Sequence, residues 1–309
     1  MQVVAEVWRG GVIESVHHGS VIGLDDGPGF RIGRPDDLTY PRSSAKPLQA
    51  LAMLRGGLDL DGELLALACA SHSGEEFHVE GVRQILAAAG LTVDDLQCTP
   101  DRPIGEKAYE AHIAAGLTPA PLYMNCSGKH AAMLATCVHN GWPTGNYLFP
   151  AHPLQRLIHD TVAELAHEPV QVTTVDGCGA PLFAITLTGL ARAFRTIATS
   201  DDPFMQRVAA AMNTYPEWVG GTGRDVTTLM RVLPGAVAKD GAEGVYALAL
   251  PDGRAVALKI ADGSSRARAV VMVAALDRLG VSVAGLSDLA SVPVLGHGKP
   301  VGAIRAAHI

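Results

Sequence analysis

Alternation of apolar and polar positions characterises the first 30 residues. The chain there contains three segments, VVAEVWRG, GVIESVHHG and SVIGLDD, separated by glycines and followed by an Asp-Gly pair, a pattern typical of strands joined by turns. We expect them to form an edge of an antiparallel sheet. Strand patterns return after residue 234 in GAVAKDG, VYALAL and AVALKI. Pro251-Asp252-Gly253 predicts a hairpin between the last two, so strands from both chain ends can share one sheet.

Helical periodicity dominates the middle of the chain. The apolar positions of RSSAKPLQALAMLRGG recur at helical spacing and stop at Gly56-Gly57, so the first helix should begin between residues 43 and 47. Amphipathic stretches continue to about residue 227, separated by glycine and proline clusters. The segment SSRARAVVMVAALDRLG is also amphipathic, and we expect this helix to close the fold.

This order of elements predicts a mixed α/β fold of the α+β type, an antiparallel sheet flanked by helices with a helical lobe. We expect a single globular unit over residues 1–309. The sheet lobe would comprise residues 1–45 and 228–309, and the mainly helical lobe residues 46–227. A site between two such lobes would lie in a cleft.

Charge and composition exclude several classes of partner. The 309 residues carry 24 basic and 31 acidic side chains, a net charge of −7, without a long run of either sign. We therefore expect no binding to nucleic acid or to an anionic membrane. Acids and glycines interrupt the N-terminal segment where a signal peptide needs apolar residues, and no run approaches the roughly 18 residues of a membrane span. The predicted location is the cytoplasm.

Cysteine and lysine are both scarce enough to be informative. The five cysteines are odd in number and scattered along the chain, unlike a secreted disulfide framework. Reduced thiols or metal ligands are therefore expected. Arginine outnumbers lysine 18 to 6, so each of the few lysines is a candidate for a role in chemistry rather than a simple surface charge.

Ser43 and Lys46 form a Ser-x-x-Lys motif where the first predicted helix begins. This spacing stacks both side chains on one helix face, and a lysine there can take the serine proton during attack. Pro47 confines the motif to the first turn, where proline is tolerated. Free N–H groups at that helix end can stabilise an oxyanion and disfavour a charged amine on Lys46. Chance supplies such a motif in about one chain in four of this composition, so a capping serine followed by a surface lysine is the alternative.

A second serine and a second lysine extend the motif. Serine β-lactamases and penicillin-binding proteins combine Ser-x-x-Lys with a loop serine and a Lys-Thr-Gly edge strand. Lys239-Asp240-Gly241 follows a strand-like segment and has the matching place in the order of elements; an ordinary turn is the alternative. Ser71 lies in a loop of the predicted helical lobe, and we expect it to pair with Lys239.

Two cysteines occur in polar turns rather than in apolar runs. Cys126 begins CSGKH, and Cys178 lies in DGCGAP. Folding could bring them together, and Lys129 or His130 could add a nitrogen ligand to make a zinc site with an open position. The spacing differs from that of Cys-x-x-Cys zinc sites, so a redox-sensitive pair and two unrelated thiols are alternatives.

Two further residues are candidate substrate contacts. Arg224 follows the glycine-rich turn GGTG, and its guanidinium could hold a substrate carboxylate through two hydrogen bonds. His72 adjoins Ser71, and we assign it to the substrate site from this position.

Together these motifs resemble the asparaginase II family, typified by the inducible, thermolabile rhizobial L-asparaginase. The resemblance runs along most of the chain, through RSSAKPLQALA, CASHS, NCSGKH, AHPLQ, DGCGAP, the GTGR turn and VAKDG. It implies a fold similar to that of serine β-lactamases and glutaminases, and a homodimer.

The resemblance also implies two Ser-Lys pairs and a zinc ion held by two cysteines and a lysine. In this sequence they are Ser43 with Lys46, Ser71 with Lys239, and the zinc ligands Cys126, Lys129 and Cys178.

The expected activity is hydrolysis of L-asparagine to L-aspartate and ammonia, with Ser43 as nucleophile and Lys46 as base. Ser71 and Lys239 would move protons and keep Lys46 partly neutral. Zinc would position the substrate or support local structure, because a metal-activated water would make the serines redundant. The alternatives are a β-lactamase-like or esterase-type serine acyl hydrolase and a non-catalytic zinc-binding protein.

Overall fold

A single large antiparallel sheet forms the base of the protein. The computed structural model describes all residues, 1–309. The sheet has eight strands, with β3 paired to β2 beside a continuous path of seven. That path runs β11 (Ser291–Gly296), β12 (Lys299–Ala306), β1 (Gln2–Arg9), β2 (Val12–Leu24), β10 (Ala255–Ile260), β9 (Val245–Ala249) and β8 (Val237–Asp240), and β3 spans Phe30–Ile32.

Two small ribbons supplement the sheet. They pair β4 (Leu38–Thr39) with β7 (Ile185–Thr186), and β5 (Thr173–Val175) with β6 (Pro181–Phe183).

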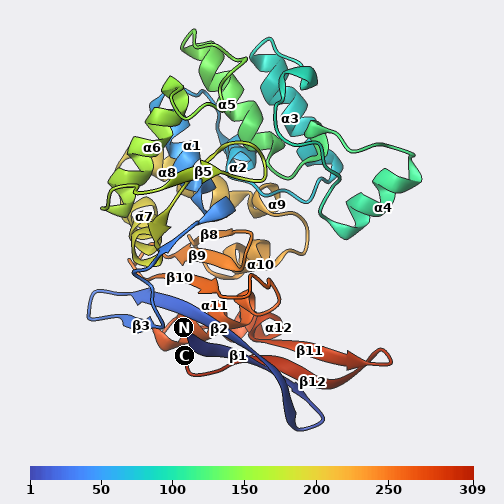
Figure 1. The fold of residues 1–309 in the computed structure, drawn as a ribbon, viewed down its shortest axis with the longest axis vertical. Helices are drawn as coiled ribbons and strands as arrows, with labels where there is room; N and C mark the ends of the chain where they lie inside the picture. Colours follow the sequence, from blue (N-terminus) through green and yellow to red (C-terminus); the bar gives the residue numbers. More distant parts are fainter.

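Most of the helices lie above β8 in Figure 1, away from the β11–β12 end of the sheet. They are α1 (Lys46–Arg55), α2 (Gly62–Ala68), α3 (Glu76–Ala88), α4 (Glu106–Ala114), α5 (Ser127–His139), α6 (Pro153–Ala166), α7 (Leu187–Thr199), α8 (Pro203–Thr214), α9 (Pro216–Val219), α10 (Asp225–Val232), α11 (Arg268–Arg278) and α12 (Ser287–Ala290). Short 3-10 helices are η1 (Arg42–Ala45), η2 (Val93–Asp95), η3 (Pro121–Tyr123) and η4 (Ala284–Leu286). None of the helices has both the length and the apolar character needed to cross a membrane.

Helices cover the central strands, which are buried along their length. β9 is buried at every position, and β10 at all but Lys259. Helix α7 packs against β2, β9 and β10, while α11 packs against β10 and β12. This cover explains why the segments VYALAL and AVALKI are almost entirely apolar instead of alternating.

The structure confirms the mixed α/β class and the shared sheet. β1 and β2 from the N-terminus lie in the same sheet as β8, β9 and β10. The hairpin predicted at Pro251-Asp252-Gly253 joins β9 to β10, and the first helix ends at Arg55, before Gly56-Gly57.

Two expectations about the sheet are wrong. The N-terminal strands are interior, because β12 pairs with the outer side of β1. The helix α11 also does not close the fold, since β11 and β12 follow it. Pro293 and Pro300 interrupt their alternating pattern, and proline is compatible with strands mainly at edges and at strand starts, which are the positions found here.

Candidate active site

Lys46 begins α1 and meets a serine from a different part of the chain. Its amine Nζ donates to the Ser71 hydroxyl at 3.0 Å and to the Ala70 carbonyl at 2.5 Å. The side chain is only 1% exposed. A buried amine needs such partners, and Ala70 offers a carbonyl just beyond the end of α2.

Ser43 lies in η1, the 3-10 helix directly before α1. The helix start agrees with the prediction, but the Lys46 amine bonds Ser71 instead of Ser43. The preceding residue, Arg42, has a left-handed backbone with φ of 51°. Its guanidinium Nε bonds Asp176 Oδ1 at 2.8 Å, which ties the Ser43 turn to the loop that carries Cys178.

Ser71 is held by its backbone and by those of its neighbours. Its N–H donates to the Val219 carbonyl at 3.0 Å, and the next N–H, of His72, donates to the Asn125 carbonyl at 3.1 Å. The Ser73 hydroxyl bonds the Gly220 carbonyl at 2.9 Å. The loop is therefore fixed between α9 and the segment that precedes α5, with the Ser71 hydroxyl directed at Lys46.

Lys239 lies on β8, the edge strand nearest the helices. Its amine bonds the carbonyl and the carboxylate of the next residue, Asp240, at 2.7 and 2.6 Å. The side chain is fully buried, and burial lowers the pKa of the Lys239 amine to about 8 although the Asp240 charge opposes the shift. The expected Ser71–Lys239 hydrogen bond is absent, since Ser71 bonds Lys46.

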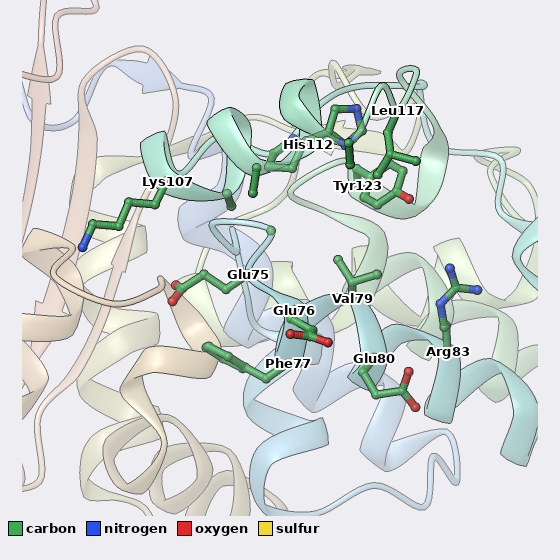
Figure 2. Close-up of a pocket in the computed structure, with 15 residues that line it drawn as sticks. Glu75, Glu76, Phe77, Val79, Glu80, Arg83, Lys107, His112, Leu117 and Tyr123 are labelled. Atoms are coloured by element: carbon green, nitrogen blue, oxygen red, sulfur yellow. The ribbon is translucent and has the colours of Figure 1, made fainter.

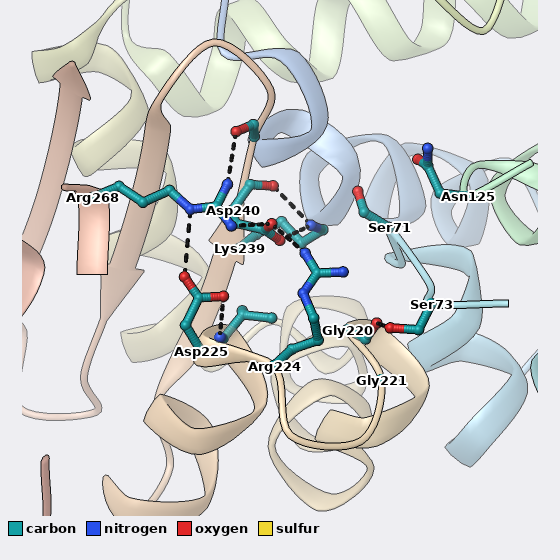
Figure 3. A network of polar contacts seen from close by, with 12 residues as sticks. Ser71, Ser73, Asn125, Gly220, Gly221, Arg224, Asp225, Lys239, Asp240 and Arg268 are labelled. Carbon is teal, nitrogen blue, oxygen red and sulfur yellow. Dashed lines mark hydrogen bonds and ion pairs between the residues drawn. The ribbon is translucent and has the colours of Figure 1, made fainter. Parts of the chain in front are cut away.

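Arg224 and Arg268 complete a network around Asp240 (Figure 3). Arg224 Nη2 lies 2.9 Å and Arg268 Nη2 lies 3.0 Å from Asp240 Oδ2. Arg224 is therefore engaged with a carboxylate of the protein itself, and a substrate contact by its remaining N–H groups stays a prediction. The sequence did not predict the roles of Asp240 and Arg268, because the network joins residues of β8, of the turn before α10 and of α11.

His72 is fully buried beside the same loop. The Ser127 hydroxyl donates to the Leu122 carbonyl, so its oxygen accepts a hydrogen bond from His72 Nε2 at 2.8 Å. Burial, followed by the nearby charges of His78 and Lys46, holds the pKa of His72 well below its usual value. His72 is thus a neutral residue inside the wall of the site, and its contact with substrate stays a prediction.

Cys126, Lys129 and Cys178 come together as the sequence suggested. Lys129 Nζ lies 3.2 Å from Cys178 Sγ, and Cys126 Sγ bonds Asn125 Oδ1 at 3.2 Å. The adjoining Cys126 thiol, followed by the charge of Lys129, holds the pKa of the Cys178 thiol far below its usual value although burial opposes the shift. All five cysteines are free thiols.

This cluster fits a zinc ion in the chemistry of its donors, two thiols and an amine. His130 lies near the same thiol and helps to lower the pKa of Cys178. Its Nε2 is buried without a hydrogen-bond partner. No group of three or more His, Cys, Asp or Glu side chains forms a metal site, so binding here depends on the amine of Lys129.

A groove lies beside this site, between α3 and α4 (Figure 2). It encloses about 1190 Å³, and its lining includes Glu75 and Lys107 but none of the predicted catalytic residues. Glu75 accepts hydrogen bonds from the N–H and hydroxyl of Thr222 at 2.8 and 2.7 Å. The groove is thereby joined to the glycine-rich turn before Arg224.

Comparison with known sequences gives one family. The sequence model described as L-asparaginase II matches residues 5–306. Among curated proteins, none matches the chain.

Two similar solved structures are β-lactamases by title. A putative β-lactamase from Bacteroides dorei DSM 17855 is 13% identical, with a TM-score of 0.45 over 84% of this chain and 93% of that chain. A β-lactamase from Mycobacterium bovis is 16% identical, with a TM-score of 0.44 over 80% of this chain and 88% of that chain. Likeness of this size carries no argument about chemistry.

Proposed function

The chain belongs to the L-asparaginase II family, and from this premise we propose that it hydrolyses L-asparagine to L-aspartate and ammonia by a Ser-Lys mechanism. Membership of the family makes the protein an amidohydrolase that acts on a small molecule. The structural observation that supports the mechanism is the buried hydrogen bond between Lys46 and Ser71, at 3.0 Å. A lysine hydrogen-bonded to a serine is an arrangement that can accept a hydroxyl proton.

In the acylation step, the Ser43 oxygen attacks the carbon of the substrate side-chain amide. The hydroxyl proton passes through Ser71 to Lys46, which are joined by the hydrogen bond. As the carbon–nitrogen bond breaks, Lys46 gives this proton to the amide nitrogen, which leaves as ammonia, and Lys46 is neutral again. The product of this step is an ester between Ser43 and the aspartyl group.

In the second step, water attacks the ester. Its proton follows the same route to Lys46, the carbon–oxygen bond to Ser43 breaks, Lys46 returns the proton to the Ser43 oxygen, and L-aspartate leaves. Lys239 carries a proton beside the site, where its amine is bound to Asp240. A pKa near 8 suits exchange of that proton near neutral pH.

Ser71 is a second candidate for the nucleophile. It is favoured by its direct bond to Lys46, whereas Ser43 is favoured by its place directly before α1. In both versions, Lys46 is the base.

A zinc ion held by Cys126, Lys129 and Cys178 would supply a positive charge that orders the loops around the site. The Arg42–Asp176 ion pair, at 2.8 Å, links one of these loops to Ser43. This chain's residues would thus couple the zinc cluster to the position of the serine. A homodimer remains a prediction of the family resemblance, which light scattering after gel filtration can check.

The test of the proposed function is a small amide panel. Ammonia release from L-asparagine and L-glutamine is measured beside the hydrolysis of a chromogenic β-lactam and of a p-nitrophenyl ester. The proposal predicts that L-asparagine is the preferred substrate. Turnover of the β-lactam or the ester alone would replace it with the acyl-hydrolase alternative.

A further inference from the structure

We propose that Asp240 is a positioning residue, whose carboxylate is clamped by Arg224 and Arg268 and holds the amine of Lys239 charged and fixed at the site. The proposal rests on the use of Lys239 in the proposed reaction. Three cations from three elements share one carboxylate: Oδ1 accepts from Lys239 at 2.6 Å, and Oδ2 from Arg224 at 2.9 Å and from Arg268 at 3.0 Å.

The position of the Lys239 amine is imposed by this clamp. Successive side chains of a strand point to opposite faces of the sheet, so a lysine would ordinarily extend away from the residue that follows it. Here the amine turns back to bond both the carbonyl and the carboxylate of Asp240. At the same time, the Ser44 hydroxyl holds the Lys239 carbonyl at 2.9 Å. Backbone and side chain are therefore both fixed at the end of β8.

Arg268 contacts Asp240 from α11 and is held in place by other groups of the protein. It begins α11 and is 9% exposed, with Nη1 donating to the Gly241 carbonyl at 3.2 Å. Its Nε lies 3.4 Å from Asp225 Oδ2, and its guanidinium stacks over the ring of Tyr246 at 5.5 Å from the centroid. Because the Arg268 guanidinium is already occupied by these contacts within the protein, it can fix the Asp240 carboxylate but is not available to bind substrate.

Because Lys239 and Asp240 are both buried, the contact between them strongly affects the protonation of each. Lys239 is fully buried and Asp240 is 4% exposed, and a buried charge without a partner is strongly disfavoured. Burial alone would raise the pKa of Asp240, but Lys239, Arg268 and Arg224 hold that pKa far below its usual value. The carboxylate therefore stays charged and opposes the loss of the Lys239 proton.

The sign of the effect follows from the groups that face Lys239. Burial lowers the pKa of Lys239, Asp240 raises it, and Lys46 and Arg224 lower it, with a net value of about 8. Cys69, nearby, has a pKa of about 12 because of burial, so it carries no charge near neutral pH. Loss of the Asp240 charge should therefore shift the Lys239 titration to lower pH and leave the amine neutral at pH 7.

The test is a titration of Lys239 that does not depend on activity. The chain has only six lysines, so the ¹³Cε resonances of labelled protein can be assigned with lysine-to-arginine variants. For the full-length protein, we expect a midpoint near 8, and a midpoint lower by about one unit or more in Asp240→Asn. The matched control is Asp252→Asn, which removes a carboxylate from an exposed arginine pair in the β9–β10 turn. It should leave the midpoint unchanged.

Two further variants and the activity profile complete the test. Arg268→Gln removes a competing cation from the Asp240 carboxylate and should move the Lys239 midpoint to higher pH. Arg268→Lys keeps the positive charge and should leave the midpoint closer to that of the unaltered protein. Arg268→Gln also provides the test if the Asp240→Asn protein does not fold. With ammonia release as the readout, activity should fall as pH rises through the Lys239 midpoint, and this fall should begin at lower pH in Asp240→Asn. Unchanged midpoints in Asp240→Asn and Arg268→Gln would overturn the proposal. An inactive protein with shifted midpoints would instead refute the proposed function alone.

Discussion

The amine of Lys46 lies 3.0 Å from the hydroxyl of Ser71, a residue 25 positions further along the chain. The serine three positions before Lys46, in contrast, does not share this hydrogen bond. A base that contacts the loop serine directly gives the two serines different roles. Those roles can be separated by substitution.

The first prediction concerns the two serines. Ser43→Ala removes the proposed nucleophile and should lower kcat/KM for ammonia release by roughly a thousandfold or more. Ser71→Ala removes the relay and should cost about a hundredfold or more, with the acyl group still forming on Ser43. Ser287→Ala, on the exposed helix α12, is the control. Near-full activity of Ser43→Ala with complete loss in Ser71→Ala would assign the nucleophile to Ser71.

The second prediction concerns zinc. Cys178→Ser replaces a thiol of the cluster with a hydroxyl, a weaker ligand for zinc, and should reduce the metal content of purified protein measured by mass spectrometry. Cys137→Ser changes another buried thiol, on α5, and should retain the metal. Equal metal in both variants, or none in the unaltered protein, would refute zinc binding by this cluster.

The third prediction concerns the turn that carries Arg224. Gly221 has φ of 127°, and a Cβ there would overlap the Ser73 hydroxyl. Gly221→Ala should therefore push the turn away from the Ser71 loop and lower kcat/KM. Gly223 has φ of 75° with no atom within 4 Å of its added Cβ, so Gly223→Ala adds backbone strain of about 1–2 kcal/mol without the overlap.

Thermal unfolding and ammonia release separate the two effects. Both alanine variants should unfold at lower temperature, but Gly221→Ala alone should lose most of its activity. Equal activities in the two variants would show that the contact between the turn and the Ser71 loop does not matter for the reaction.

Much of the fold could be predicted from the sequence because its signals are local. Pro47 and the Gly56-Gly57 pair bracket the first helix, and apolar runs beyond residue 234 mark strands that are buried in the sheet. The last two strands could not be found this way, because Pro293 and Pro300 break the alternation. Their strand geometry depends on pairing at the sheet edge, which is a property of the folded sheet.

The site residues were predictable as motifs, but their contacts were not. Ser43 and Lys46 have the spacing of a pair, yet the orientation of the Lys46 amine is decided by the Ala70 carbonyl and Ser71 at the end of α2. Asp240 lies within the Lys239 motif, but its role depends on Arg268, which reaches it from α11. These contacts join residues far apart in the chain, so no fixed spacing in the sequence predicts them.

The most direct test of the account is ammonia release from L-asparagine by Lys46→Met. Methionine keeps much of the buried volume but cannot accept a proton, so kcat/KM should fall by about a hundredfold or more while the melting temperature shows a folded protein. Lys107→Met, at the groove between α3 and α4, should remain active. A folded Lys46→Met variant that releases ammonia as fast as the unaltered protein would contradict the Ser-Lys mechanism.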